Sequence, residues 1–201
     1  SYPEITVQLA RKLGIGIMYQ ELRLFQHRDV LTNLFPDREI RRGPFIARKP
    51  MEEIAKPVLE SIGLDVDLYA TLGDLAISDQ QLIELARVII EKPKLLILDE
   101  PAAGLDVGGR EDLVGRLSQL AGDESSPSLI LVTHHVEEIP PNFSHALLLK
   151  AGQVSALGEV AEVISSDSMS QAFGIPLDVE FGEERWHAHG KRPSRGRRAK
   201  A

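Results

Sequence analysis

Cysteine is absent from this 201-residue chain, which excludes disulfides and thiolate metal sites. No stretch approaches the roughly 18 consecutive apolar residues that a membrane-spanning helix needs. The first residues also lack the charged and then apolar pattern of a secretory leader. Since 43% of the residues are hydrophobic, the chain can build one sizeable core, and we expect a compact cytosolic protein.

Acidic residues outnumber basic ones, and the formal net charge is −7. A basic cluster nevertheless occupies the end of the sequence: Lys191, Arg192, Arg195, Arg197, Arg198 and Lys200. Pro193 and Gly196 interrupt the cluster, which is typical of a flexible, solvated tail. A contact with anionic lipid or nucleic acid is the second interpretation, and the acidic body makes nucleic acid the less favoured partner.

The first half of the chain predicts one short strand followed by a helical region. Residues 14–19, GIGIMY, form an apolar run typical of a buried strand. Gln20 follows this run, where a loop would begin. Across residues 36–93 the spacing of apolar side chains is helical.

Two helices can be placed within that region. The first covers residues 51–62 and contains Pro57, which should kink it. The second is predicted to begin at Ser78, whose hydroxyl would cap the helix while Gln81 reaches back to it. Pro93 follows the apolar pattern of this second helix and is expected to end it.

Two further apolar runs each deliver polar side chains to their ends. Residues 95–98, LLIL, precede Asp99-Glu100-Pro101, as in a central parallel strand that carries two carboxylates to its C-terminal edge. Residues 129–132, LILV, precede Thr133-His134-His135. Between the two runs, apolar residues on one face predict a helix: Leu113, Leu117 and Leu120, with Gly122 at its end.

A hairpin is predicted beyond these strands. Residues 146–149 and 153–156 flank Ala151-Gly152, which suggests two antiparallel strands joined by a tight turn. No internal repeat is present. The alternation of strand, helix and strand along the chain indicates an α/β fold.

The pair Asp99 and Glu100 is the first candidate for chemistry. Hydrolysis of ATP needs a metal ion on the phosphates and a polar group that orients the attacking water. Asp99 is placed like a carboxylate that holds Mg²⁺, and Glu100 could polarise the water. Taken alone, the pair could equally be two solvated acids at the end of a strand.

The order of five polar stretches strengthens the chemical interpretation. They are Gln20, Ser78-Asp79-Gln80-Gln81, Asp99-Glu100-Pro101, Gly104-Leu105-Asp106 and Thr133-His134. In this order the chain resembles the ATP-binding cassette (ABC) transporter family over roughly residues 12–160, most specifically in LLILDEPAAGLD. The resemblance implies an α/β RecA-like P-loop NTPase core with an inserted α-helical subdomain. It also implies ATP and Mg²⁺ as cofactors.

The resemblance assigns a role to each site residue. Gln20 would touch the metal ion and the attacking water, Asp99 would hold the metal ion, and Glu100 would be the catalytic base. His134 would bond the γ-phosphate and the catalytic glutamate, while Asp106 would act across a dimer interface. Two further residues would bind the ATP held by the opposing subunit: Ser78 and Gln80. The ordinary alternatives are a strand-end cap for Gln20, a surface imidazole for His134 and a turn residue for Asp106.

The stretch at the start of the second helix departs from the family pattern. Relatives carry leucine, serine, glycine, glycine and glutamine there, at the N-terminus of a helix that can hold a phosphate. Here Ala76 replaces the serine, Ser78 replaces a glycine, and Asp79 adds a negative charge. Each change is expected to weaken the binding of the opposing subunit's ATP.

The Walker A loop, Gly-x-x-x-x-Gly-Lys-Ser/Thr, does not occur in the sequence. The family places it before Gln20, so we expect a chain that lacks the N-terminal part of its core, as a fragment, a truncated product or a remnant. ATPase activity is expected if a Walker A loop completes the site. The alternative is a non-enzymatic cassette remnant that cannot bind ATP alone.

The chain resembles two branches of the family. Residues 13–101 are similar to the first cassette of monosaccharide importers. Residues 104–160 are similar to single-cassette ATPases linked to the uptake of metals or metal complexes. We favour a sugar importer, because the helical subdomain that contacts the permease in this family belongs to the sugar-like part.

Four segments and their partners follow from the resemblance. Residues 1–35 would form part of the core, 36–92 the helical subdomain, 93–165 the rest of the core and 166–201 a flexible tail. The implied partners are transmembrane permease subunits and a second cassette in a homo- or heterodimer. The implied location is the cytoplasm, at the inner face of the cell membrane.

Overall fold

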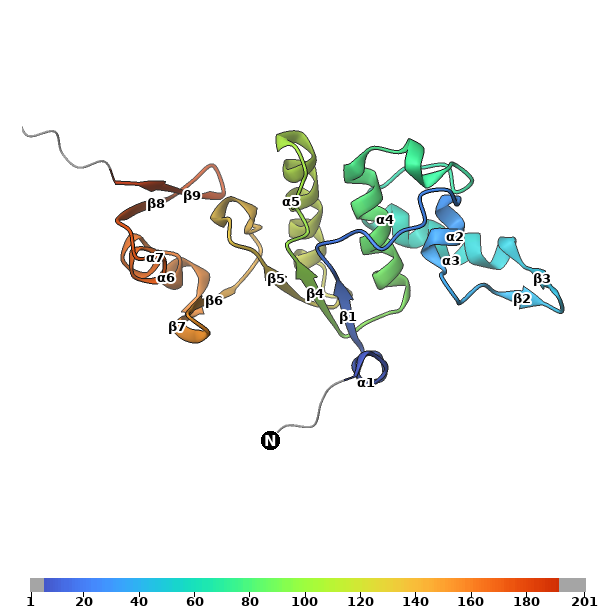
Figure 1. Ribbon diagram of the computed structural model, residues 1–201, viewed down its shortest axis with the longest axis horizontal. Helices are drawn as coiled ribbons and strands as arrows, with labels where there is room; N and C mark the ends of the chain where they lie inside the picture. The colour runs from blue at the N-terminus through green and yellow to red at the C-terminus, as the bar shows by residue number, and fades with distance from the viewer. Residues whose placement is uncertain (1–5, 192–201) are drawn as a thin grey trace, which may run out of the picture. The chain divides into compact units, whose positions relative to one another are not determined.

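The computed structural model describes residues 6–191, and the chain divides into two compact units (Figure 1). The first unit ends at His134 and the second begins at His135. This boundary falls inside the segment 93–165, which we expected to form one block. Each unit has its own hydrophobic cluster.

A three-stranded parallel sheet forms the centre of the first unit (Figure 1). Its strands are β1 (Ile15–Met18), β4 (Leu95–Asp99) and β5 (Ser128–Val132), and β4 lies in the middle. The three predicted apolar runs therefore do form strands. Leu96 and Leu98 of β4 are completely buried, because their face of the sheet packs into the core of this unit.

Helices supply most of the rest of that core. They are α2 (Val30–Leu34), α3 (Arg48–Ser61), α4 (Ile77–Ile90), α5 (Val107–Gly122) and a 3₁₀ turn at Leu72–Asp74. A further helix, α1 (Val7–Lys12), contacts β1. Helix α3 continues through Pro57 as one element. A short hairpin of β2 (Arg41–Arg42) and β3 (Phe45–Ile46) interrupts the region that we expected to be helical throughout.

The predicted cap of α4 is wrong. The helix begins at Ile77 after an extended Ala76, so Ser78 lies within the first turn and caps nothing. Gln81 does not reach back to the helix start but donates to the carbonyl oxygen of Ala103 at 3.2 Å. The capping-box pattern did not predict the cap, because the Gln81 side chain bonds instead to Ala103, which is distant in the sequence.

Gly16 of β1 has no room for a side chain. An added Cβ would lie 2.5 Å from Cγ1 of Val88 on α4. We expect Gly16→Ala to lower the free energy of unfolding by about 1–2 kcal/mol, because overpacking displaces neighbours. Gly115→Ala on α5, where an added Cβ meets nothing within 4 Å, should instead raise it by about 0.5–1 kcal/mol. Urea unfolding compares the two variants, and an unchanged Gly16→Ala stability would contradict this packing.

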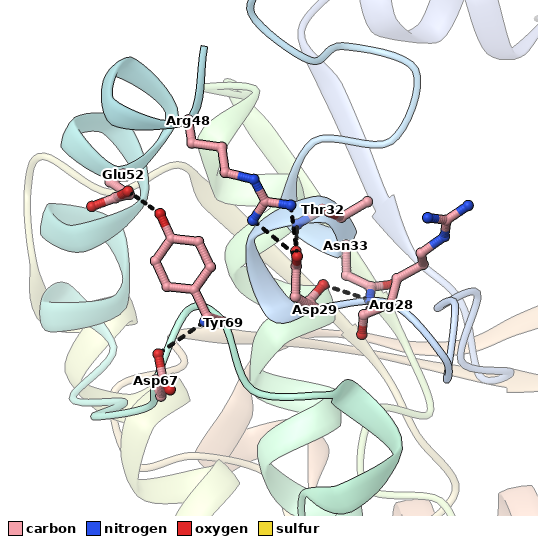
Figure 2. A network of polar contacts seen from close by, with 8 residues as sticks. All are labelled: Arg28, Asp29, Thr32, Asn33, Arg48, Glu52, Asp67 and Tyr69. Atoms are coloured by element: carbon pink, nitrogen blue, oxygen red, sulfur yellow. Dashed lines mark hydrogen bonds and ion pairs between the residues drawn. The ribbon is translucent and has the colours of Figure 1, made fainter. Parts of the chain in front are cut away.

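A polar network joins α2, α3 and the segment before the 3₁₀ turn (Figure 2). Asp29 caps α2 by accepting from the backbone N–H of Thr32 at 2.7 Å. Both terminal nitrogens of Arg48 donate to Oδ2 of the same carboxylate at 2.9 Å. The Arg48 guanidinium also lies over the ring of Tyr69, whose hydroxyl donates to Glu52. These contacts fix α3 to the start of α2.

The second unit contains two hairpins and two helices. Strands β6 (His145–Lys150) and β7 (Gln153–Glu159) pair around Ala151 and Gly152, both with positive φ, so the predicted hairpin is confirmed. It is followed by α6 (Val160–Val163), α7 (Ser166–Phe173), β8 (Leu177–Gly182) and β9 (Arg185–Gly190). Helix α7 packs against β8 and against the first hairpin.

The expectation of a flexible tail from residue 166 is wrong for residues 166–190. Ser165 caps α7, and Met169 of that helix and Leu177 of β8 are buried in the cluster of the second unit. Strand β9 pairs with β8 along its length. Most of the predicted basic tail, residues 192–201, lies outside the described residues.

Candidate functional site

The carboxyl ends of the three parallel strands bring the predicted catalytic residues together. Gln20 follows β1, Glu100 follows β4 and His134 follows β5. Parallel strands end at the same edge of a sheet, and ligands of open α/β sheets bind at that edge. Residues that are 34 and 80 positions from Glu100 in the sequence thus become its neighbours.

Glu100 lies between the other two side chains. Nε2 of Gln20 donates to Oε2 of Glu100 at 3.2 Å, and Nδ1 of His134 lies 3.0 Å from Oε1. The Glu100 side chain is 30% exposed and that of His134 is 59% exposed, so water can reach the carboxylate. A carboxylate that is held at both oxygens yet open to water has the placement of a general base.

The backbone at Glu100 adopts an uncommon conformation. Its φ is +45°, in the left-handed region that non-glycine residues rarely occupy. Its N–H donates to the carbonyl oxygen of Val132 at 2.9 Å, which extends the pairing of β4 with β5 by one residue. Strain of this kind persists where the surrounding structure imposes it, and it is common at functional sites.

Asp99 is the last residue of β4 and precedes Glu100. Within the described part of the chain, no three His, Cys, Asp or Glu side chains gather as they would around a metal ion held by protein alone. Mg²⁺ needs only one or two carboxylates when substrate phosphates complete its shell. The amide nitrogen of Gln20 is used on Glu100, so its amide oxygen is the atom that could ligate a metal ion. Asp99 and Gln20 therefore fit a nucleotide-bound Mg²⁺.

Two of the residues predicted to contact a second subunit's nucleotide, Ser78 and Asp106, lie near each other at the first turns of α4 and α5. Asp106 is the N-cap of α5 and accepts from the N–H of Gly109 at 2.7 Å. A Cβ added to Gly109 would lie 3.2 Å from Oδ1 of Asp106 and 3.3 Å from Cβ of Ser78. The first turns of α4 and α5 are thus in contact, and Ser78 lies close to Asp106.

Capping by Asp106 is measurable. We expect Asp106→Ala to lower the free energy of unfolding by about 1 kcal/mol, because the N–H of Gly109 loses its acceptor. Asp106→Asn keeps an acceptor at the same position and should be near neutral. Urea unfolding of both variants gives the comparison. Equal losses would show that the charge, and not the cap, stabilises this helix.

Gln80 does not lie where the prediction needs it. Its side chain is only 2% exposed, donates to the carbonyl oxygen of Leu75 at 2.9 Å and accepts from Gln26 at 3.1 Å. Because these bonds engage the side chain inside the unit, direct contact with a nucleotide is not its role in this structure.

The sequence did not predict the ion pair of Glu84 and Arg87, which holds the loop after Gln20. Glu84 on α4 is completely buried and accepts from the backbone N–H of Arg23 at 3.0 Å. Burial raises the pKa of its carboxyl, while the neighbouring Arg87 opposes that shift. A glutamate among the buried apolar residues of α4 was the available signal, since charged side chains are rarely buried unless paired.

Comparisons with known proteins find relatives of similar sequence. Residues 5–103 match the family described as ABC transporter. The uncharacterized ABC transporter ATP-binding protein YlmA of Bacillus subtilis (strain 168) is 38% identical over 137 residues, which are 68% of this chain and 52% of that protein. The galactofuranose transporter ATP-binding protein YtfR of Escherichia coli (strain K12) is 33% identical over 170 residues, 85% of this chain and 34% of that protein.

The fold is also that of a solved ATPase cassette. The structure of cbiO1 from Clostridium perfringens, part of the ABC transporter complex cbiONQ, aligns with a TM-score of 0.66 at 22% identity. The alignment covers 84% of this chain and 66% of cbiO1. The chain therefore has the expected RecA-like α/β fold. Among residues 6–191, no helix is long and apolar enough to cross a membrane.

Proposed function

Because this chain belongs to the ABC transporter family of ATP-binding proteins, we propose that, with a Walker A loop to complete its site, it binds and hydrolyses MgATP to drive transport through a membrane permease. The observation that carries the proposal is the carboxylate of Glu100, held between Gln20 and His134. Three residues from three strand ends meet there, which fits hydrolysis of the terminal phosphoanhydride bond of ATP by an activated water.

Each residue would have a distinct task in hydrolysis. Glu100 accepts a proton from the attacking water, and Gln20 keeps one oxygen of that carboxylate in place. His134, whose Nδ1 lies 3.0 Å from Oε1 of Glu100, would also contact a phosphate oxygen. Asp99 would hold the Mg²⁺ that neutralises phosphate charge.

Transport of a sugar is the proposed purpose of the hydrolysis. Residues 13–101 resemble monosaccharide importers, and one relative is named for galactofuranose transport. The chain spans about half of YlmA and a third of YtfR, so the substrate, like the activity, is a proposal. The similarity of residues 104–160 to a metal-uptake branch stays a prediction.

The proposed partners follow from the same family. Permease subunits would bind the helical subdomain at the inner face of the membrane, where the chain would be a peripheral protein in the cytoplasm. A second cassette would pair with this one, with Ser78 and Asp106 facing its nucleotide. Their position at two adjoining helix N-termini supports this, because such termini attract phosphate.

Titration of the 201-residue chain with a fluorescent ATP analogue and Mg²⁺ tests the proposal. Saturable binding in the micromolar range, retained in Glu100→Gln, would show that the residues of this chain suffice to hold the nucleotide without a Walker A loop. Competition with unlabelled ATP separates specific binding from adsorption. Addition of the same volume of nucleotide-free buffer is the control for dilution. Absence of binding at millimolar nucleotide would favour the alternative, a cassette without enzymatic activity that binds no ATP by itself.

A further inference from the structure

Helix α4 buries three polar side chains on a face that is otherwise apolar. Gln80, Gln81 and Glu84 are 2%, 3% and 0% exposed. Burial of a polar group costs free energy unless hydrogen bonds compensate, and burial of a charge costs more. The partners of these side chains therefore indicate what the polar face does.

Glu84 and Arg87 together hold both backbone groups of Arg23. Oε2 of Glu84 accepts from the N–H of Arg23 at 3.0 Å, and Oε1 accepts from Arg87 at 2.6 Å. Arg87 uses its other terminal nitrogen to donate to the carbonyl oxygen of Arg23 at 2.7 Å. One ion pair on the helix thus fixes one residue of the loop at two points.

Arg23 closes the short loop that carries Gln20. Its guanidinium lies 3.9 Å from the centre of the Tyr19 ring, directly after the end of β1. The loop is therefore anchored to the sheet at Tyr19 and to α4 at Arg23, and Gln20 lies between the two anchors. From that position its amide reaches Glu100 at 3.2 Å.

We propose that Glu84, with Arg87, is a positioning residue that fixes the loop so that the Gln20 amide meets the Glu100 carboxylate. The inference rests on the proposed function only for the catalytic role of that carboxylate. A buried ion pair is often no more stabilising than apolar residues of similar volume. Its distinguishing contribution here is geometric, since it holds the N–H and the carbonyl of a residue three positions from Gln20.

Three variants separate positioning from stability. Glu84→Leu removes the acceptor of the Arg23 N–H and the partner of Arg87. Glu84→Gln keeps size and an acceptor but loses the charge. Gln81→Met is the matched control, because this side chain is also buried on α4 but donates its hydrogen bond to Ala103 and not to the Gln20 loop.

The experiment is ¹⁵N NMR of the nucleotide-free 201-residue chain, with urea unfolding of every variant. The side-chain amide signal of Gln20 is assigned by its loss in Gln20→Ala, and Glu100→Ala gives its position without the carboxylate contact. We expect Glu84→Leu to move this signal to the Glu100→Ala position and to speed amide exchange of Arg23 at least about 10-fold. Glu84→Gln should move the Gln20 signal less and speed the exchange of Arg23 less than Glu84→Leu does. Gln81→Met should cause neither change.

Two outcomes would overturn the positioning role. One is an unchanged Gln20 signal in folded Glu84→Leu, and the other is an equal displacement in Gln81→Met. If Glu84→Leu does not fold, Glu84→Gln and Arg87→Met carry the same comparison, and an unmoved Gln20 signal in both has the same meaning. No nucleotide is used, so a failure of ATP binding and a failure of this proposal are separate results.

Discussion

When a Walker A loop completes the site, Glu100→Gln is expected to lower the rate of MgATP hydrolysis by about 100-fold to 10,000-fold, the contribution typical of a general base. Glutamine has nearly the same shape and can still contact Gln20 and His134, but its amide cannot take a proton from water. Nucleotide binding should therefore change little while turnover falls. Phosphate release at saturating MgATP measures the rate, and the fluorescent analogue measures binding.

The matched control for this prediction is Glu124→Gln. Glu124 is an exposed carboxylate between α5 and β5, so the substitution makes the same change of charge away from the site. Turnover in this variant should equal that of the unaltered chain. Hydrolysis by Glu100→Gln at more than about a tenth of the original rate would contradict the role of Glu100 as a base. Absence of hydrolysis in a chain that is completed by a Walker A loop and keeps Glu100 would contradict the proposed activity itself.

Asp29→Ala is expected to lower the free energy of unfolding by about 2–3 kcal/mol. Loss of the cap on α2 costs about 1 kcal/mol. Loss of the two hydrogen bonds from Arg48 adds about 1–2 kcal/mol, a contribution that is kept small because the Arg48 side chain is partly exposed. Figure 2 shows both contacts meeting at one carboxylate. Asp29→Asn keeps a cap and should lose about half as much. A loss below about 0.5 kcal/mol in Asp29→Ala would contradict this account.

The same carboxylate should make stability depend on pH. Burial alone would raise the pKa of Asp29, but hydrogen bonds from Thr32 and Arg48 outweigh it, so the pKa lies below the ordinary value of 3.8. The stability that Asp29 contributes is therefore fully present above that ordinary value and is lost as the pH falls through the lowered pKa. Urea unfolding from pH 6 downward measures this, and Asp29→Asn should lack this part of the acid loss.

Much of the candidate site could be predicted from the sequence. The runs LLIL and LILV are strands, as uninterrupted apolar runs bounded by polar residues predict. Ile130 and Val132 of β5 are nevertheless 46% and 45% exposed, so this strand is not buried on both faces. The contact of His134 with Glu100 was expected from the family resemblance, and the parallel strands bring the two residues to one edge of the sheet. The contact of Gln20 with Glu100 was not predicted.

Other features depend on contacts between distant segments. Ser78 and Gln81 match a capping box, yet α4 begins earlier and Gln81 bonds to Ala103, so a local signal was overridden. The hairpin of β8 and β9 was expected as flexible tail, because its strands become stable only by pairing and by packing on α7.

The sequence by itself determined the strands, the order of the polar stretches and the edge at which they meet. It did so because apolar periodicity and the residue after a strand are local properties of the chain. The burial of Gln80 and the hold of Glu84 on Arg23 were decided only by the tertiary structure. Gln26 bonds to Gln80 and Arg23 bonds to Glu84 from a segment that lies far away in the sequence, and no local pattern specifies which backbone group a buried carboxylate will meet.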